Sequence, residues 1–404
     1  MRLDEFVADL ERDREAERRE LAREKSYEIT EYLADTERRF DEVTQGSSLF
    51  GSTAPSIFVG RSSYPDVAAG VLAPVDDRDH AADYETGPHW YRRGFTIDDV
   101  FQARTNLLNS TQRTSVHVAD EWSGFTGVQR EVAIADRPVD VEVGLDGPLD
   151  VDLDVGFDDV ATPTGPRATA ESATLAENPH VPRAVEKTLE DDDWRATGAM
   201  NYLYERGFDV YDVNSILSAG ALGRTDERKL VPTRWSITAV DDTIGQFLRG
   251  RVRSNPSIDT VQVHYNEFLA NRFWIVLAPG DWEFELVELK APGSVWNPDP
   301  DRGTLIATDY EPATGRTAYV DETAGAYHAA RLGVLEYLDG IDRRATARQV
   351  RESVRDAFGD RHGTAESLGA AVRRIADTLP VPHDRLRRTA ELVAAQQTSL
   401  DRFG

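Results

Sequence analysis

Glu288 and Lys290 are the residues whose types and spacing most directly allow chemistry. They lie at the end of the segment from Trp282 to Lys290, in which charged and apolar residues alternate. Metal-dependent nucleases use a glutamate and a lysine in this arrangement, because the carboxylate holds Mg²⁺ and the lysine stabilises or activates the attacking water. Such a site also needs an aspartate from a neighbouring strand. The available aspartates are Asp241, Asp242, Asp259 and Asp281.

The nuclease pattern has a structural alternative. None of the four aspartates stands at a spacing diagnostic of a nuclease, and alternating charges are typical of a strand with one face in water. We therefore treat Asp241, Glu288 and Lys290 as candidate catalytic residues only, and Mg²⁺ is expected as a cofactor only if the chain is such a nuclease. Otherwise the sequence predicts no cofactor and no metal site.

The C-terminal tail has a spacing suited to binding another protein. Its eight residues are Gln397, Thr398, Ser399, Leu400, Asp401, Arg402, Phe403 and Gly404. Gln397, Leu400 and Phe403 recur at every third position, and one 3₁₀ turn would place all three on the same face. Leu400 and Phe403 would then fill an apolar pocket, while the Gln397 amide would hydrogen bond to a polar group beside it. The spacing predicts a docking peptide.

This tail resembles the clamp-binding box (PIP box) of proteins that bind the sliding clamp PCNA, whose usual form is Gln-x-x-Leu-x-x-Phe-Phe. Here Gly404 stands where the box has its second aromatic residue. Because buried aromatic residues carry much of the binding energy of an interface, the missing ring implies weaker and reversible binding. The resemblance predicts PCNA as a partner, and a frayed helix end without a role is the alternative.

Two segments are basic within a strongly acidic chain. Residues 341–390 contain 11 arginines against 7 acidic residues, and residues 224–253 contain 7 basic against 4 acidic residues, while the whole chain has a net charge of -26. Such basic segments allow contact with DNA phosphates. The alternative is that their arginines pair with neighbouring carboxylates on solvated helix faces. DNA is therefore only a possible partner at this stage.

Composition indicates a soluble cytoplasmic protein of a high-salt cell. The 72 acidic residues are spread along the chain, and such a surface keeps a protein hydrated in strong salt. The absence of cysteine excludes disulfides and thiolate metal sites, and the eight histidines show no helical zinc spacing. We found no signal peptide, no membrane-spanning segment and no nucleotide-binding or acyl-transfer motif.

The elements that must position these residues indicate an α+β fold with a mixed or mainly antiparallel sheet. Residues 1–44 have the pattern of a charged helical arm, and residues 45–297 have that of an α+β body. Within the body we expect a buried strand at Ala54–Arg61 and a hairpin that joins residues 139–143 to 149–155. A helix is expected at Ala184–Arg206, with Gly207 as its cap.

The second half of the body predicts a mostly antiparallel sheet. It has short aromatic or β-branched segments bounded by turn residues, at Val231–Thr238, Thr260–Tyr265, Arg272–Leu277 and Trp282–Leu289. The prolines and glycine of Trp296–Gly303 then break the chain, so a smaller and mainly helical region is expected at 298–395. Its amphipathic segments are Ala324–Leu338, Ala345–Phe358, Ala365–Leu379 and Asp384–Gln396. The tail, 396–404, follows them.

Several segments together resemble the archaeal Nre DNA-repair proteins. They are Ala54–Arg61 with Tyr64-Pro65 and Gly70, Thr233–Asp241, and the tail. The resemblance runs from about residue 27 to the end, and it implies a role in the repair of DNA damage together with PCNA binding through Gln397, Leu400 and Phe403. Members of the family commonly carry a cysteine-bearing, zinc-type segment at the N-terminus, which this chain lacks.

The resemblance also draws attention to a possible functional surface. Arg61, Tyr64, Arg234 and Trp235 lie in the segments that carry it. Tryptophan in such a segment is more often a core residue than a base-stacking one, so we expect Trp235 to be buried. The sequence leaves open whether the body is an adaptor that binds DNA or a nuclease.

Overall fold

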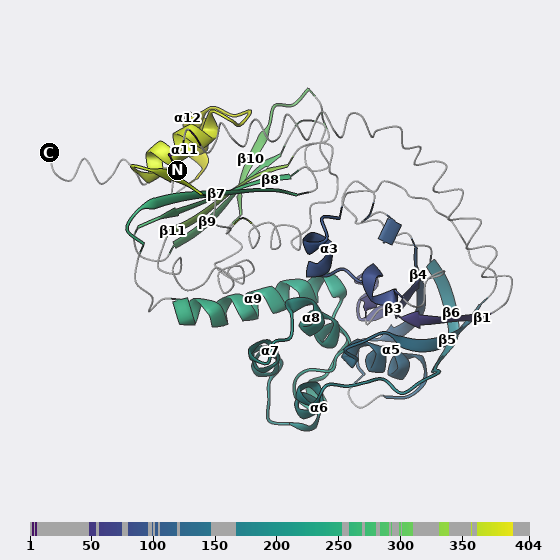
Figure 1. Cartoon of the computed structure of the whole chain (residues 1–404). Helices are drawn as coiled ribbons and strands as arrows, with labels where there is room; N and C mark the ends of the chain where they lie inside the picture. The colour runs from purple at the N-terminus through teal and green to yellow at the C-terminus, as the bar shows by residue number, and fades with distance from the viewer. Residues whose placement is uncertain are drawn as a thin grey trace. The chain divides into compact units, whose positions relative to one another are not determined.

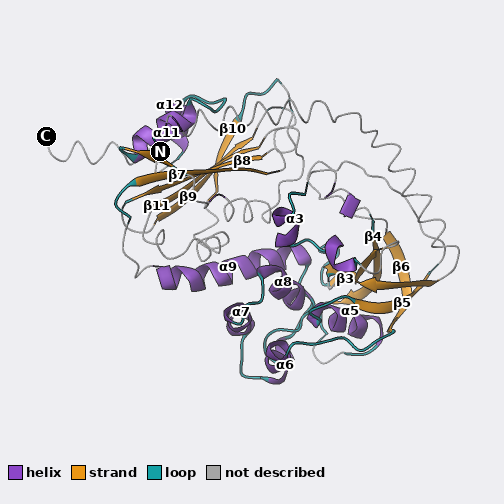
Figure 2. Ribbon diagram, in the orientation of Figure 1, coloured by secondary structure: helices purple, strands orange, loops and turns teal. Residues whose placement is uncertain are grey.

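The computed structural model of the chain divides into two compact units. It describes residues 48–53, 56–74, 80–95, 106–118, 122–146, 167–252, 258–268, 271–279, 283–290, 301–309, 331–338 and 362–390, with a few single positions between them. One unit is Glu28–Ile244, here called the body unit, and the other combines Met1–Tyr27 with Gly245–Gly404, here called the terminal unit. The described part of each unit holds a six-stranded sheet with helices (Figures 1 and 2), which confirms the α+β fold.

The sheet of the body unit has the strand order β1-β5-β6-β4-β3-β2. Its strands are β1 (Ser48–Thr53), β2 (Ile57–Val59), β3 (Asp66–Pro74), β4 (Leu107–Ser115), β5 (Val139–Leu145) and β6 (Arg167–Leu175). All neighbours are antiparallel except β4 and β6, which are parallel. The strand predicted at Ala54–Arg61 is confirmed as β2, and its Ile57 and Val59 are buried.

The prediction that β5 forms a hairpin with residues 149–155 is wrong. Val139, Val141 and Val143 are buried and alternate with residues that keep contact with solvent, as the sequence predicted. However, β5 pairs with β1 on one edge and with β6 on the other, so neither edge is left for residues 149–155. Those residues lie outside the described part of the chain. Alternation reports which face is buried, but it does not specify the neighbouring strand.

Helices of the body unit lie on and beside this sheet. They are η1 (Ala81–Tyr84), α3 (Pro88–Arg92), α5 (Gly124–Ile134), α6 (Arg183–Glu190), α7 (Ala196–Glu205), α8 (Val210–Ser218), η2 (Thr225–Glu227) and the first part of α9 (Thr233–Val252), which continues past Ile244 into the terminal unit. Helix α5 contacts β2, β3 and β6 (Figure 1). The helix predicted at Ala184–Arg206 is confirmed as α6 and α7, with a break between them, and Gly207 follows with a φ of 90°.

The segment Val231–Thr238, which we grouped with the strands, instead begins a helix. The carbonyl of Pro232 accepts hydrogen bonds from the backbone N–H groups of Trp235, at 2.7 Å, and Ser236, at 3.0 Å. Proline is favoured at a helix start, because its missing N–H would have no partner there. This end effect outweighs the moderate strand preference of the β-branched residues that follow.

The sheet of the terminal unit has the strand order β10-β9-β11-β8-β7-β12. Its strands are β7 (Val261–Phe268), β8 (Asn271–Ala278), β9 (Glu283–Lys290), β10 (Leu305–Asp309), β11 (Arg331–Leu338) and β12 (Gly363–Ala365). The unit also contains helices α11 (Leu368–Ala376) and α12 (His383–Thr389). Strands β9 and β11 are parallel and the other neighbours are antiparallel. The three strands predicted between residues 260 and 289 are confirmed as β7, β8 and β9.

The region after residue 297 is not mainly helical where the structure describes it. The helix predicted at Ala324–Leu338 is wrong over Arg331–Leu338, which forms β11 between β8 and β9. The apolar residues of this segment fit either period, and two neighbouring strands that supply backbone partners on both edges favour the strand. Strands before and after the Trp296–Gly303 break share one sheet, so that break falls inside the terminal unit.

Other predictions for the termini have mixed outcomes. The helix predicted at Ala365–Leu379 is confirmed over Leu368–Ala376 as α11, although Ala365 itself ends β12. The one beginning at Asp384 is confirmed as far as Thr389 in α12. The helical arm (1–44), apart from three positions near its start, Ala345–Phe358, apart from Ala357, and the tail (396–404) lie outside the described residues. No helix in the part of the chain that the structure describes is long and apolar enough to cross a membrane.

The core of the terminal unit lies between one face of the sheet and α11 and α12. Trp274 and Val276 of β8 and Leu289 of β9 are buried with Ile375 of α11 and Leu386 of α12. Burial of each such side chain stabilises the fold by about 1.5–3 kcal/mol. This cluster anchors the last described helix to the sheet.

A candidate nucleic-acid interface at Tyr64 and Trp235

Tyr64 and Trp235 form an exposed aromatic pair on the body unit. Their ring centroids are 5.3 Å apart with an interplanar angle of 51°. Tyr64 is 48% exposed and Trp235 is 45% exposed, and Phe50 is the one other large hydrophobic residue in the described part of the chain that is exposed to this degree. An exposed indole contradicts our expectation that Trp235 belongs to the core.

The periodicity of α9 explains the exposure of Trp235. The buried positions between Thr233 and Ile244 include Ser236, Val240 and Ile244, which recur at every fourth residue and form one stripe, with the buried Asp241 beside it. Trp235 directly precedes this stripe, and successive helical residues point about 100° apart. Its ring therefore lies beside the buried stripe, where it meets Tyr64.

The turn between β2 and β3 holds Tyr64 in place. The Gly60 N–H donates to the Ala68 carbonyl at 2.7 Å, and the Asp66 N–H donates to the Ser63 carbonyl at 2.9 Å. Ser63 has a φ of 67°, and the Tyr64–Pro65 peptide bond is cis. A non-glycine residue in this left-handed region costs roughly 1 kcal/mol, so the rest of the turn must fix it there. These contacts define the backbone of the turn that carries Tyr64.

The first turn of α9 is tied to the same strand, β2. Thr233 Oγ1 accepts a hydrogen bond from the Val59 N–H at 2.9 Å and lies 3.3 Å from Ser218 Oγ. Ser236 Oγ donates to Asn214 Oδ1 of α8 at 2.6 Å. Because β2 leads into the Tyr64 turn and also holds the start of α9, the backbone sets the distance between the two aromatic rings.

Two exposed arginines flank the aromatic pair in the sequence. Arg61 belongs to the turn that carries Tyr64, and Arg234 precedes Trp235 in α9. The first turn of α9 contains no acidic residue, and neither arginine forms an ion pair with the residues that the structure describes. The one carboxylate of the turn, Asp66, lies 3.6 Å from Arg113 Nη2. We call Arg61, Tyr64, Arg234 and Trp235 the Tyr64–Trp235 patch.

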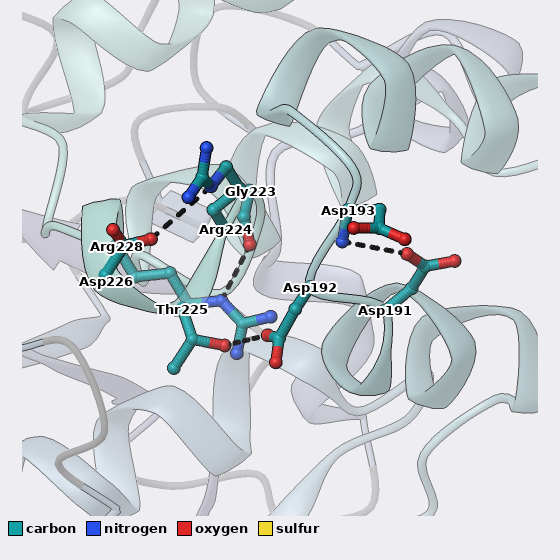
Figure 3. A network of polar contacts seen from close by, with 8 residues as sticks. All are labelled: Asp191, Asp192, Asp193, Gly223, Arg224, Thr225, Asp226 and Arg228. Atoms are coloured by element: carbon teal, nitrogen blue, oxygen red, sulfur yellow. Dashed lines mark hydrogen bonds and ion pairs between the residues drawn. The ribbon is translucent and has the colours of Figure 1, made fainter.

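Other arginines of the basic segment 224–253 have structural roles (Figure 3). Arg228 is 5% exposed and donates to the carbonyls of Gly223, at 3.0 Å, and Leu189, at 2.8 Å. Arg224 forms an ion pair with Asp226 at 3.5 Å. Arg228 therefore holds the loop around η2 and is not available to DNA phosphates, whereas Arg224 and its partner Asp226 are both exposed. The side chains of Arg249, Arg251 and Arg253 lie outside the described part of the chain.

A hydrogen bond between two loops completes this network. Thr225 Oγ1 donates to the Asp192 carboxylate, and the Asp193 N–H donates to Asp191 Oδ1 at 3.1 Å (Figure 3). The acidic run 191–193 is thereby engaged in joining the α6–α7 connection to η2. Asp191 and Asp192 thus have a structural role in this loop.

The nuclease candidates are not brought together by a shared strand. Asp241 and its neighbour Asp242 lie in helix α9 instead of on a strand, and Asp241 is buried. Asp259 precedes β7, which is three strands from β9 in the sheet. With strands about 4.8 Å apart, that separation is roughly 14 Å. None of these three aspartates therefore lies on a strand adjacent to β9.

The backbone register of β9 gives the neighbours of the two candidate residues. Glu288 lies opposite Ala307 of β10 and Glu336 of β11, and Lys290 lies opposite Leu305 and Leu338. Asp309 of β10 lies opposite Leu286 and so shares a face of the sheet with Ala307. Asp281 lies outside the described residues, as do the side chains of Glu288 and Lys290. Within the described part of the chain, no three His, Asp or Glu residues are grouped so that they could hold a metal ion.

Sequence reasoning named all four residues of the patch but missed those that position it. Ser63 and Thr233 set the turn and the helix start, and neither has a type that suggests chemistry. Pro232 directly before Thr233 is a recognisable helix-start signal. This signal predicts a helix from Thr233, which would place Trp235 in a helix and not in a strand.

Comparison with known proteins places the chain in one family. The N-terminal profile of archaeal Nre proteins matches residues 21–297, and the C-terminal profile matches residues 311–348. The DNA repair protein NreA of Haloferax volcanii is 59% identical, with both chains covered in full.

More distant relatives agree with this assignment. The DNA repair protein NreA of Archaeoglobus fulgidus is 38% identical over 79% of this chain and 78% of the relative, and the NreB protein of that organism is 38% identical over 76% and 75%. No solved structure matches the fold. Because a family profile covers more than half of the chain and a relative matches over its full length, the chain belongs to the archaeal Nre family.

Proposed function

We propose that this chain is a DNA repair factor that the sliding clamp PCNA recruits to DNA through the C-terminal tail. The relatives that match it over most or all of their length are named DNA repair proteins, which supports a role in DNA repair. The observation that carries the clamp-binding step is the spacing of Gln397, Leu400 and Phe403. One short turn would present these three side chains together to a pocket on the clamp.

Binding through this tail should be reversible. Leu400 and Phe403 supply two apolar anchors, and Gly404 leaves the position of a second ring empty. A weaker attachment suits a factor that must leave the clamp after it has acted, because affinity differences between related complexes are set mainly by the dissociation rate. In this proposal the tail determines where the protein acts, and the body determines what it does there.

Clamp capture by variants of the tail tests the proposal. Immobilised PCNA from the same organism should retain the full chain, whereas a chain ending at Ala395 and the double variant Leu400→Ala, Phe403→Ala should both pass through. The matched control is Thr398→Ala with Asp401→Ala, because these positions do not fall on the predicted binding face. Equal retention of the full chain and the truncated chain would refute recruitment by the tail.

A gain-of-function variant provides an independent check. Gly404→Phe restores the second aromatic residue of the box. One well-buried aromatic ring contributes on the order of 1–2 kcal/mol to an interface, so the affinity for PCNA should rise about tenfold. Calorimetry measures this change directly. An unchanged affinity would show that the tail does not bind as a clamp-binding box.

A further inference from the structure

We propose that the Tyr64–Trp235 patch is a stacking platform for an unpaired nucleobase of damaged or single-stranded DNA. The inference deepens the proposed repair function and rests on it, since it assigns to the body unit the contact with DNA that the tail does not make. Four features carry it, namely the exposed rings, the rigid elements beneath them, the local charge and the charge of the whole chain.

The rings have the chemistry that a base recognises. Nucleobases stack on aromatic side chains regardless of sequence, because every base has a π face. Tyr64 and Trp235 are each nearly half exposed, and their 51° tilt at 5.3 Å means that neither ring covers the face of the other fully. The exposed halves of the indole and the phenol add nothing to the stability of the fold, so their exposure side by side favours an external partner.

The elements that carry the two rings are joined before any ligand binds. Ser63 is held at a φ of 67°, and Thr233 ties the start of α9 to Val59. A platform that is already ordered loses little conformational entropy on binding, which leaves more of the stacking energy as affinity. Loops that merely expose aromatic residues would lack this advantage.

Electrostatics favour stacking over a contact driven by phosphates. A net charge of -26 repels DNA, and Arg61 and Arg234 are only two local positive charges. Counterion release makes contacts between arginine and phosphate weaken steeply with salt, whereas stacking depends on it much less. The two arginines can hold phosphates beside a stacked base, but the rings must supply most of the affinity.

The same argument selects an unpaired base as the ligand. Within an intact duplex both faces of a base are covered by its neighbours, and exposing one face costs a few kcal/mol. A base in a bulge, a mismatch or a single strand is exposed at a lower cost. The platform should therefore discriminate between damaged or open DNA and the matched duplex, which is the discrimination that a repair factor needs.

Binding of labelled oligonucleotides to the full chain tests the inference. Fluorescence anisotropy would compare a short thymidine single strand, a matched duplex, and the same duplex with a bulge of unpaired bases. The wild type should bind the single strand and the bulged duplex more tightly than the matched duplex. Trp235→Ala and Tyr64→Ala should each weaken that binding about tenfold, which corresponds to the loss of one stacked base.

Matched variants separate stacking from a general loss of structure. Phe50→Ala removes an equally exposed aromatic residue elsewhere on the body unit and should leave binding unchanged. Trp235→Phe keeps a ring and should retain most of the affinity, which would show that the loss in Trp235→Ala is not misfolding. Arg61→Ala and Arg234→Ala should mainly reduce the salt dependence, each by about one phosphate contact.

The possible outcomes also distinguish this inference from recruitment by the clamp. The chain ending at Ala395 should bind DNA as the full chain does, and Trp235→Ala should still bind PCNA. Equal DNA binding by the wild type and the two alanine variants would overturn the stacking platform. The platform would also be overturned if the alanine variants lost affinity for the matched duplex as much as for the single strand and the bulged duplex. If a protein ligand and no DNA binds the patch, the inference fails while clamp recruitment stands.

Discussion

Thr233 Oγ1 accepts a hydrogen bond of 2.9 Å from the Val59 N–H, and this bond joins the start of α9 to β2. The two residues are 174 positions apart in the sequence. Because β2 continues into the turn of Tyr64, this one bond connects the two elements that carry the aromatic pair. The arrangement of the Tyr64–Trp235 patch thus depends on a threonine that has no exposed chemistry of its own.

The first prediction concerns this bond. Thr233→Val keeps the shape of the side chain but removes the acceptor, which leaves the buried Val59 N–H without a partner. We expect the free energy of unfolding to fall by about 1–3 kcal/mol, together with weaker binding of oligonucleotides by the patch. Thr238→Val is the control, because Thr238 is exposed on the same helix. Equal urea denaturation midpoints for the two variants would contradict the assigned role.

The extent to which this site could be predicted follows from the kind of information that each part requires. Strands β7 to β9 were predictable because turn residues bound short aromatic and β-branched segments, a signal that is local. The identity of the patch residues was also local. The exposure of Trp235 was not, because it depends on which face of α9 packs against the rest of the body unit, and a helix of moderate amphipathicity does not fix that face.

Strand pairing could not be predicted from the sequence, because it also depends on contacts between distant segments. β5 pairs with β6 across a long connection, and β4 pairs in parallel with β6. β11 pairs between strands that precede it by some 40 to 60 positions, as its registers with Glu283 and Ala278 show. Such contacts are set by the packing of the whole sheet, and periodicity in one segment carries no information about them.

The second prediction concerns the cap of α8. Asp212 accepts a hydrogen bond from the Asp209 N–H at 3.0 Å in a capping box. Burial of the carboxyl group, followed by the charges of Asp209 and Asp136, raises the pKa of Asp212 from 3.8 to about 6. A carboxyl group with a raised pKa disfavours the folded state above that pKa, because the unfolded chain loses its proton more readily.

Asp212→Asn should therefore stabilise the protein at neutral pH. The amide oxygen can still accept the bond from Asp209, and no charge remains. Although its carboxyl group is partly desolvated by its neighbours, Asp212 as a whole is exposed, so the gain is screened and should stay below about 1 kcal/mol. It should shrink as the pH falls from 6 towards 3.8, where the carboxyl group of the wild type becomes protonated in both states. Thermal unfolding at the two ends of this range measures the difference, and a gain that does not depend on pH would contradict the mechanism.

The third prediction concerns a histidine in the terminal unit. His264 is fully buried on β7 and its ring stacks on that of His362, with centroids 5.2 Å apart. Burial, and then the charge of His362, lowers the pKa of His264 from 6.5 to about 4. As the pH falls below 6.5, His264 becomes protonated in the unfolded chain but stays neutral in the folded chain. The folded state therefore loses stability down to about pH 4.

The size of this effect can be isolated with a variant. The contribution of His264 is at most about 3 kcal/mol across that range. His264→Gln should be less stable than the wild type above pH 6.5, because its side chain fits the buried site less well, but the difference should narrow towards pH 4. Urea denaturation of both proteins across the range gives the two curves. Parallel curves would show that another group causes the acid sensitivity.

The fourth prediction concerns two glycines with opposite surroundings. A Cβ added at Gly70 of β3 would lie 1.9 Å from the Ser110 carbonyl oxygen, which belongs to the adjacent strand β4 and cannot move without breaking the sheet. At Gly198, within α7, a Cβ would meet no atom within 4 Å. Gly70→Ala should therefore abolish or severely reduce the yield of folded protein. Gly198→Ala should stabilise the protein by about 0.5–1 kcal/mol, because alanine loses less backbone entropy on folding.

This pair of variants also tests whether the Tyr64–Trp235 patch depends on the packing of β2, β3 and β4. Gly70 pairs with Phe58 of β2 and with Thr111 of β4, so the close approach of the three strands depends on the missing side chain. β2 then supplies Val59 to Thr233 and leads into the turn of Tyr64. Any Gly70→Ala protein that remains soluble should accordingly lose oligonucleotide binding together with its near-ultraviolet circular dichroism, whereas Gly198→Ala should keep both. If Gly70→Ala folded with the stability of the wild type, β3 and β4 could not be packed as closely as the structure places them.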